Sequence, residues 1–234
     1  TNGAVVTPSD TSTDSSGAAT VILSSPDGSV RTTTITVQDP GGVFPTELIT
    51  IPGRSAPPLP EHIVANSTRD QVTVSDVPED ATVKVYNAHD DLIGTGQYTV
   101  ENEGVVVVTT SPYDMAAGET IYVTLTEKDR IESVAVPKIA QAETSMLTAD
   151  QVTANGTTDE VTVTAVPVGA TIIVRSSSNV ELGQATNAGP GTVVVIDELT
   201  LTEGQQLQVT MIETAKLESQ PITVTVTLEK SAKP

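Results

Sequence analysis

The chain has 234 residues, 37% of them hydrophobic and 18% charged, with a net charge of −19 and no Cys or Trp. This length fits one large or two small domains. Such an excess of acidic residues argues against nucleic-acid and anionic-membrane partners, since these are bound by basic surfaces. No apolar run approaches the roughly 20 residues that span a bilayer, and the absence of Cys removes disulfides, thiolate metal sites and Cys nucleophiles.

Residues 1–56 are predicted to form a partial β domain. Gly17–Ser25 and Val30–Gln38 have strand composition and flank the turn sequence Ser25-Pro26-Asp27-Gly28-Ser29, which predicts a hairpin. Glu47–Ile51 is a third expected strand, and Pro57–Pro60 is expected to be a stiff linker. The open sheet has two interpretations: it is part of a larger domain, or its strands complete a neighbouring subunit and build a fibre.

An internal repeat organises the rest of the chain. Gln71–Val74 matches Glu160–Val163 at an offset of 89 residues. In our alignment the offset falls to 87 at Val106–Val108, which we match to Val193–Val195, and to 86 at Gly118. The gaps fall in expected loops and the matches in apolar runs, so the sequence predicts a duplicated domain covering 61–140 and 141–234.

Each copy is predicted to consist of strands. Apolar and polar residues alternate at Val72–Ser75, Thr82–Val85 and Ile121–Thr126, which indicates strands with one buried face. Val105–Val108 is apolar throughout and is expected to be a central strand covered on both sides. Short strands separated by turn sequences every 8 to 12 residues predict β-sandwiches. The predicted fold class is therefore all-β, with tandem β-sandwiches after the partial N-terminal β domain.

Three segments of the first copy resemble the bacterial immunoglobulin-like (Big-type) modules that occur in tandem in surface, S-layer and adhesin proteins. They are Val77–Tyr86, Asp91–Gly94 and Ala117–Thr124. The resemblance extends over residues 61 to 228, without the Cys pair and core Trp of antibody domains. It implies an extracellular location on a bacterial surface, where such modules serve as spacers, lattices, stalks or adhesive tips. The acidic, Thr- and Val-rich composition, and a first residue other than Met, lead us to expect a processed surface protein.

Two groups of side chains are candidate sites. Ca²⁺ binds six to eight oxygen ligands, and the acidic loops around Glu79, Asp80 and Asp91 could supply them, although solvated turn residues are the simpler interpretation. Tyr86 and Tyr122 are predicted to point outward from adjacent strands and to form an aromatic platform for a protein interface or a ligand.

Catalysis is not expected from this sequence. His62 lies beside the expected linker and His89 in a turn, and neither has an evident Ser or Cys partner. The expected role is structural, in an S-layer, fibre or adhesin stalk that associates with itself or with neighbouring modules. The alternative is an accessory or adhesive module that binds a cell-wall polysaccharide or a host ligand. Ca²⁺ is the one cofactor that the sequence suggests.

Overall fold

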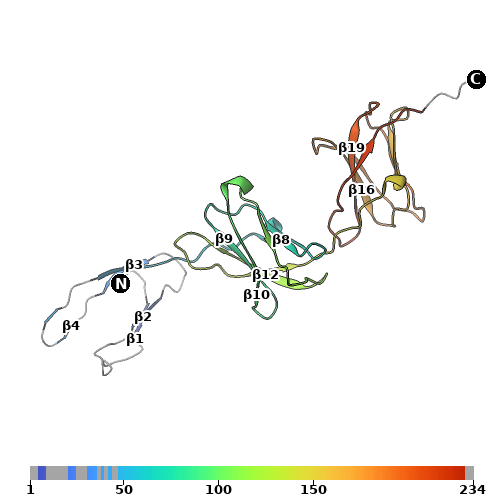
Figure 1. Cartoon of the computed structure of the whole chain (residues 1–234). Coiled ribbons are helices and arrows are strands. Elements are labelled where there is room, and N and C mark those ends of the chain that lie inside the picture. Colours follow the sequence, from blue (N-terminus) through green and yellow to red (C-terminus); the bar gives the residue numbers. More distant parts are fainter. Residues whose placement is uncertain are drawn as a thin grey trace, which may run out of the picture. The chain divides into compact units, whose positions relative to one another are not determined.

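A computed structural model describes residues 47–229 and five short strands before them, at 5–8, 21–24, 31–35, 38–39 and 42–43. The described residues are almost entirely strands and turns (Figure 1). Contacts divide the chain into two units, which are described separately below. Within the described ranges, no helix has the length and apolar character to cross a membrane.

The N-terminal strands pair differently from the prediction. β2 (Val21–Ser24) and β3 (Arg31–Ile35) fall inside the two predicted strands, but β2 pairs with β1 (Val5–Pro8) and β3 pairs with β6 (Glu47–Ile51). A further pair joins the short strands β4 (Gln38–Asp39) and β5 (Gly42–Val43). The predicted β2–β3 hairpin is therefore wrong, because a turn sequence reverses the chain locally without choosing which strands pair. The turn itself lies outside the described residues.

The first sandwich consists of two antiparallel sheets. Its three-stranded sheet has the order β11-β8-β7 and its four-stranded sheet the order β10-β9-β12-β13. In chain order the elements are η1 (Pro60–His62), β7 (Ile63–Asn66), β8 (Gln71–Val74), β9 (Thr82–Tyr86), β10 (Leu92–Gln97), η2 (Val100–Asn102), β11 (Val106–Thr109), β12 (Thr120–Thr126) and β13 (Val136–Ile139).

The second sandwich repeats this architecture, with sheets in the orders β14-β15-β18 and β17-β16-β19-β20. Its elements are η3 (Ala149–Gln151), β14 (Val152–Asn155), β15 (Glu160–Val163), β16 (Thr171–Ser176), β17 (Glu181–Thr186), β18 (Val194–Ile196), β19 (Gln206–Ile212) and β20 (Ile222–Thr225). The predicted all-β fold of tandem sandwiches is confirmed.

Each core is built by the predicted alternation along the strands. Val83 and Val85 of β9 and Ile121 and Val123 of β12 are fully buried. At the corresponding positions of the second sandwich, the core contains Ile172 and Val174 of β16 and Leu207 and Val209 of β19. Burial of these β-branched and aliphatic side chains is the main favourable contribution to folding of each sandwich.

The register corrects one step of the repeat alignment. Val107 lies opposite Thr73, and Val195 lies opposite Thr162, so Val107 corresponds to Val195 at an offset of 88 rather than 87. An error of one residue exchanges the buried and exposed faces of a strand. In a run of identical valines the sequence alone contains nothing to fix this register.

The expectation that Val105–Val108 is a central strand covered on both sides is wrong. β11 is at one end of the three-stranded sheet, and Val107 is 52% exposed. The run reads as apolar on both faces because the exposed positions of this edge strand are also valines.

Glycines allow β10 of the opposite sheet to pack closely against β11. A Cβ atom on Gly94 would lie 2.6 Å from Val108 Cγ1 and 3.1 Å from the carbonyl oxygen of Thr109. In the second sandwich, a Cβ on Gly183 would lie 2.9 Å from Ile196 Cγ2. A strand glycine often marks such an approach, and here β10 covers the outer edge of β11.

We expect Gly94→Ala to lower the free energy of unfolding of the first sandwich by about 1–3 kcal/mol, since the added methyl overpacks this contact. Gly96→Ala should cost less, because the nearest backbone atom to its added Cβ, the Val107 carbonyl oxygen, is 3.6 Å away and its counterpart in the second copy is Ala185. Urea unfolding of both variants checks this order, with Gln97→Ala, at an exposed position of β10, as the control. Equal losses at Gly94 and Gly96 would contradict it.

The first sandwich begins upstream of the predicted linker. Arg54 bridges Ile131 in parallel, and the Ser55 amide donates to the Ile131 carbonyl at 2.9 Å. In the second sandwich, the Thr144 amide donates to Leu217 in the same way, also at 2.9 Å. The predicted boundary at residue 56 therefore differs from the observed pairing, because a Pro-rich sequence indicates stiffness and not whether the segment packs.

Candidate functional site

The outer face of the four-stranded sheet carries a cluster of hydrogen-bonded polar side chains in each sandwich. In the first sandwich, the register places Tyr122 of β12 directly opposite Tyr86 of β9, and Thr124 opposite Lys84. Both tyrosines are half-buried. Alternation along the strands positions these four side chains away from the core.

Glu132, in the segment after β12, connects these side chains. Its carboxylate accepts hydrogen bonds from Lys84 Nζ at 2.7 Å, Tyr86 Oη at 2.8 Å and Thr124 Oγ1 at 2.6 Å. Burial acts to raise the pKa of Glu132, but the bonds from Lys84, Thr124 and Tyr86 outweigh it and hold the pKa below its ordinary value. The bond to Glu132 in turn raises the pKa of Lys84, and burial followed by that bond raises the pKa of Tyr86.

The second sandwich retains the carboxylate and threonine but changes their partners. Arg175 lies opposite Gln208 in the places of Tyr86 and Tyr122, and the buried Ile173 replaces Lys84. Glu218 bonds both Thr210 and Arg175, and Arg175 Nη1 also donates to Thr210 Oγ1 at 3.2 Å. Burial acts to raise the pKa of Glu218, and the bonds from Arg175 and Thr210 outweigh it and lower the pKa.

The residue after each glutamate also has the same role in both copies. Ser133 Oγ accepts the Leu125 amide at 2.9 Å, and Ser219 Oγ accepts the Met211 amide at 3.0 Å. Both serines are buried. The Glu-Ser pair therefore fastens the segment after β12 to β12 in the first sandwich, and the segment after β19 to β19 in the second.

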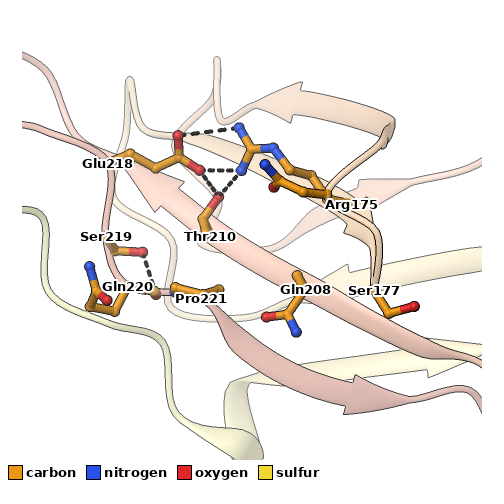
Figure 2. Close-up of a pocket in the computed structure, with 9 residues that line it drawn as sticks. Arg175, Ser177, Gln208, Thr210, Glu218, Ser219, Gln220 and Pro221 are labelled. Atoms are coloured by element: carbon orange, nitrogen blue, oxygen red, sulfur yellow. Dashed lines mark hydrogen bonds and ion pairs between the residues drawn. The ribbon is translucent and has the colours of Figure 1, made fainter. Parts of the chain in front are cut away.

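A hollow of about 600 Å³ lies beside this cluster in the second sandwich. Figure 2 shows Arg175, Thr210 and Glu218 bonded together at one side, with Gln208 and Ser177 farther along the face. The lining is polar apart from one proline and comprises Arg175, Ser177, Asn179, Gln208, Thr210, Glu218, Ser219, Gln220 and Pro221. The hollow therefore adjoins the positions that correspond to the tyrosine pair of the first copy.

The predicted calcium residues do not gather around one point. Asp80 lies 3.8 Å from Lys128 Nζ, Asp91 accepts a bond from Asn87 Nδ2 at 3.0 Å, and Glu79 is exposed in a turn. Across the described part of the chain, no three acidic or His side chains form a group that could hold a metal ion. Calcium binding by Glu79, Asp80 and Asp91 stays a prediction without geometric support.

The two histidines occupy ordinary surroundings. His62 Nε2 lies 3.4 Å from the exposed carboxylate of Asp76, and His89 is exposed in a turn whose backbone is held by Asn87 Oδ1. Neither of these two contacts includes a nucleophilic side chain.

Sequence reasoning missed the Glu132 and Glu218 clusters and the hollow. A signal was present, because Glu132-Ser133 and Glu218-Ser219 repeat at the same offset as Val123-Thr124 and Val209-Thr210. This repeated Glu-Ser pair could not be interpreted without knowing that the segments after β12 and β19 fold back over their sheets.

Neither a protein-family model nor a curated protein matches the chain. Solved structures similar to it include a biofilm-associated protein BSP domain (20% identity, TM-score 0.31), of which the chain covers 29% with 73% of its own length. The adhesin domain of Epf from Streptococcus pyogenes is 14% identical with a TM-score of 0.33, and the match includes 70% of this chain and 73% of that domain. The FN1–FN3 domains of chicken CNTN1 are 12% identical with a TM-score of 0.32, and the match includes 88% of this chain and 79% of those domains. At these low scores the similarities do not indicate function.

Proposed function

We propose that this chain is a structural segment of a bacterial cell-surface protein, in which immunoglobulin-like modules in series form an extracellular stalk, fibre or S-layer element. The observation that carries this proposal is a comparison of the contacts and exposed side chains of the two sandwiches. They share contacts that hold the fold together, and they differ in the chemistry that they expose.

The shared contacts are of three kinds. The Glu–Thr and Ser–amide bonds fasten the segment after β12 in the first copy and the segment after β19 in the second. The glycines at 94 and 183 permit the same close packing, and a short bridge joins the first segment of each sandwich to the loop at Ile131 or Leu217. Tyr86 and Tyr122 are replaced by Arg175 and Gln208 at the exposed positions. A role that depends on the fold explains this pattern, whereas a ligand site common to both copies would keep its side chains.

A covered β11 edge and negative charge suit such a role. β10 packs against the outer edge of β11, so this edge is poorly placed to pair with other chains. A net charge of −19 keeps the chain soluble and limits non-specific association. In this proposal the segment is not an enzyme, its partners are neighbouring modules or other copies, and any Ca²⁺ is recruited weakly by its acidic loops.

A display experiment tests the structural role. The chain is placed between a bacterial wall anchor and an antibody epitope, and capture of the cells by antibody-coated beads is measured. Capture should exceed that of an insert containing residues 141–229 alone, since folded modules in series each add their own length. Equal capture with the two inserts would contradict the proposal.

The alternative function, an adhesive or carbohydrate-binding module, is favoured by the direct Tyr86–Tyr122 pairing on an open sheet face. The same cells would then adhere to protein- or polysaccharide-coated surfaces without the epitope antibody. Tyr86→Ala and Tyr122→Ala should abolish that adhesion while the chain stays monomeric. Self-association lost on removal of residues 1–52 would instead identify the N-terminal strands as an assembly device.

A further inference from the structure

We propose that the hollow on the second sandwich is a weak binding site for a neutral saccharide. This inference goes beyond the structural role, because a stalk or lattice element can perform its role with the site empty. It depends on the charge balance of the hollow, on its hydrogen-bonding groups and on its position over central strands.

The charge balance excludes strongly charged ligands. Arg175 and Glu218 are bonded to each other, so the two charges that line the hollow compensate. The chain around them is acidic and repels phosphates and uronates. A cation has no unpaired carboxylate to meet in this lining. A ligand without net charge fits best.

The hydrogen-bonding groups match a polyol. The lining offers the Asn179 and Gln208 amides and the Ser177 hydroxyl beside the Arg175–Glu218 pair, so it supplies both donors and acceptors. Gln208 uses Nε2 in a 3.2 Å bond to Thr223, and no hydrogen bond within the described chain occupies its carbonyl oxygen. Each sugar hydroxyl both donates and accepts, and vicinal hydroxyls pair with an amide or a guanidinium–carboxylate group.

The position argues against an extended peptide as the occupant. Arg175 and Gln208 belong to β16 and β19, the two central strands of the sheet β17-β16-β19-β20. The main-chain groups of these strands pair within the sheet, so a peptide could not bind here by adding a strand. Side chains alone must therefore recognise the ligand. Pro221 is the one apolar side chain in the lining, and without an aromatic surface the affinity should be in the millimolar range.

Saturation-transfer-difference NMR on the whole chain tests the site. The probes are cellotetraose, N-acetylglucosamine tetramer and mannotetraose, each at about 5 mM, with tetragalacturonate as the charged comparison. We expect transfer to at least one neutral probe and none to the uronate. Gln208→Ala should weaken that binding about fivefold, as expected when one hydrogen bond to the ligand is lost.

Gln206→Ala is the matched control, because Gln206 lies two residues earlier on the same strand, is exposed and does not line the hollow. Both variants should retain the unfolding midpoint of the unmodified chain. The proposal is overturned if no neutral probe receives saturation, if the uronate binds as well as the neutral sugars, or if Gln208→Ala binds like Gln206→Ala. Binding lost only on Tyr86→Ala would also overturn it, by placing the ligand on the first sandwich.

Discussion

Ile172→Ala is expected to lower the free energy of unfolding of the second sandwich by about 2–5 kcal/mol, through lost burial and the cavity left behind. Ile172 is fully buried in the central strand β16 and belongs to the core with Val174, Leu207 and Val209. Because each sandwich has its own core, β9 and β12 of the first sandwich should keep their stability.

Hydrogen exchange read by mass spectrometry measures both effects in one sample. Amides of β16 and β19 should exchange faster in the variant, while those of β9 and β12 should not change. Ile139→Ala is the matched control, since this side chain is 58% exposed on β13, and its change should stay within about 0.5 kcal/mol. Faster exchange throughout both sandwiches would contradict separate cores.

Acid sensitivity should decrease when the two cluster glutamates are replaced together, as in the double variant Glu132→Gln/Glu218→Gln. Each carboxylate has a pKa lowered by its hydrogen bonds, against the opposing effect of burial. A group whose pKa is lower in the folded state contributes stability above its unfolded pKa and loses it as the pH falls through the folded pKa. The unmodified chain should therefore lose this contribution below about pH 4.5.

The double variant should be less stable at pH 7 by about 1 kcal/mol per cluster, a size set by the partial exposure of both pairs. Its melting temperature should then fall less between pH 5 and pH 3 than that of the unmodified chain. The double variant Glu79→Gln/Glu203→Gln, at one exposed turn position in each sandwich, controls for the change in net charge. Parallel acid curves for the double variant and the unmodified chain would show that the clusters do not contribute in this way.

Sequence reasoning could predict the fold because burial is encoded locally. Alternation at Val83 and Val85, repeated at Ile172 and Val174, marks the buried faces of β9 and β16 without knowledge of their neighbours. The 89-residue offset then showed that one architecture occurs twice. Register is not local, which explains the one-residue error at Val107 and the misplacement of β11 at the sheet centre.

The outer-face clusters could be predicted only in part. Strand alternation indicated that Tyr86 and Tyr122 share a face, whereas Glu132 and Glu218 come from segments that reach this face by folding back over it. The pairs β1–β2 and β3–β6 likewise depend on contacts that the local strand pattern does not specify. In each case the sequence specified side-chain chemistry, and the tertiary contact decided where it acts.

Stretching single molecules held at the two ends tests most directly whether the chain is a series of independent structural modules. We predict two unfolding steps of equal contour length, about 300 Å each, because about 90 residues extend in each sandwich. Ile172→Ala should lower the force of one step only. A single step that releases both sandwiches together, or two steps of clearly different length, would contradict the account.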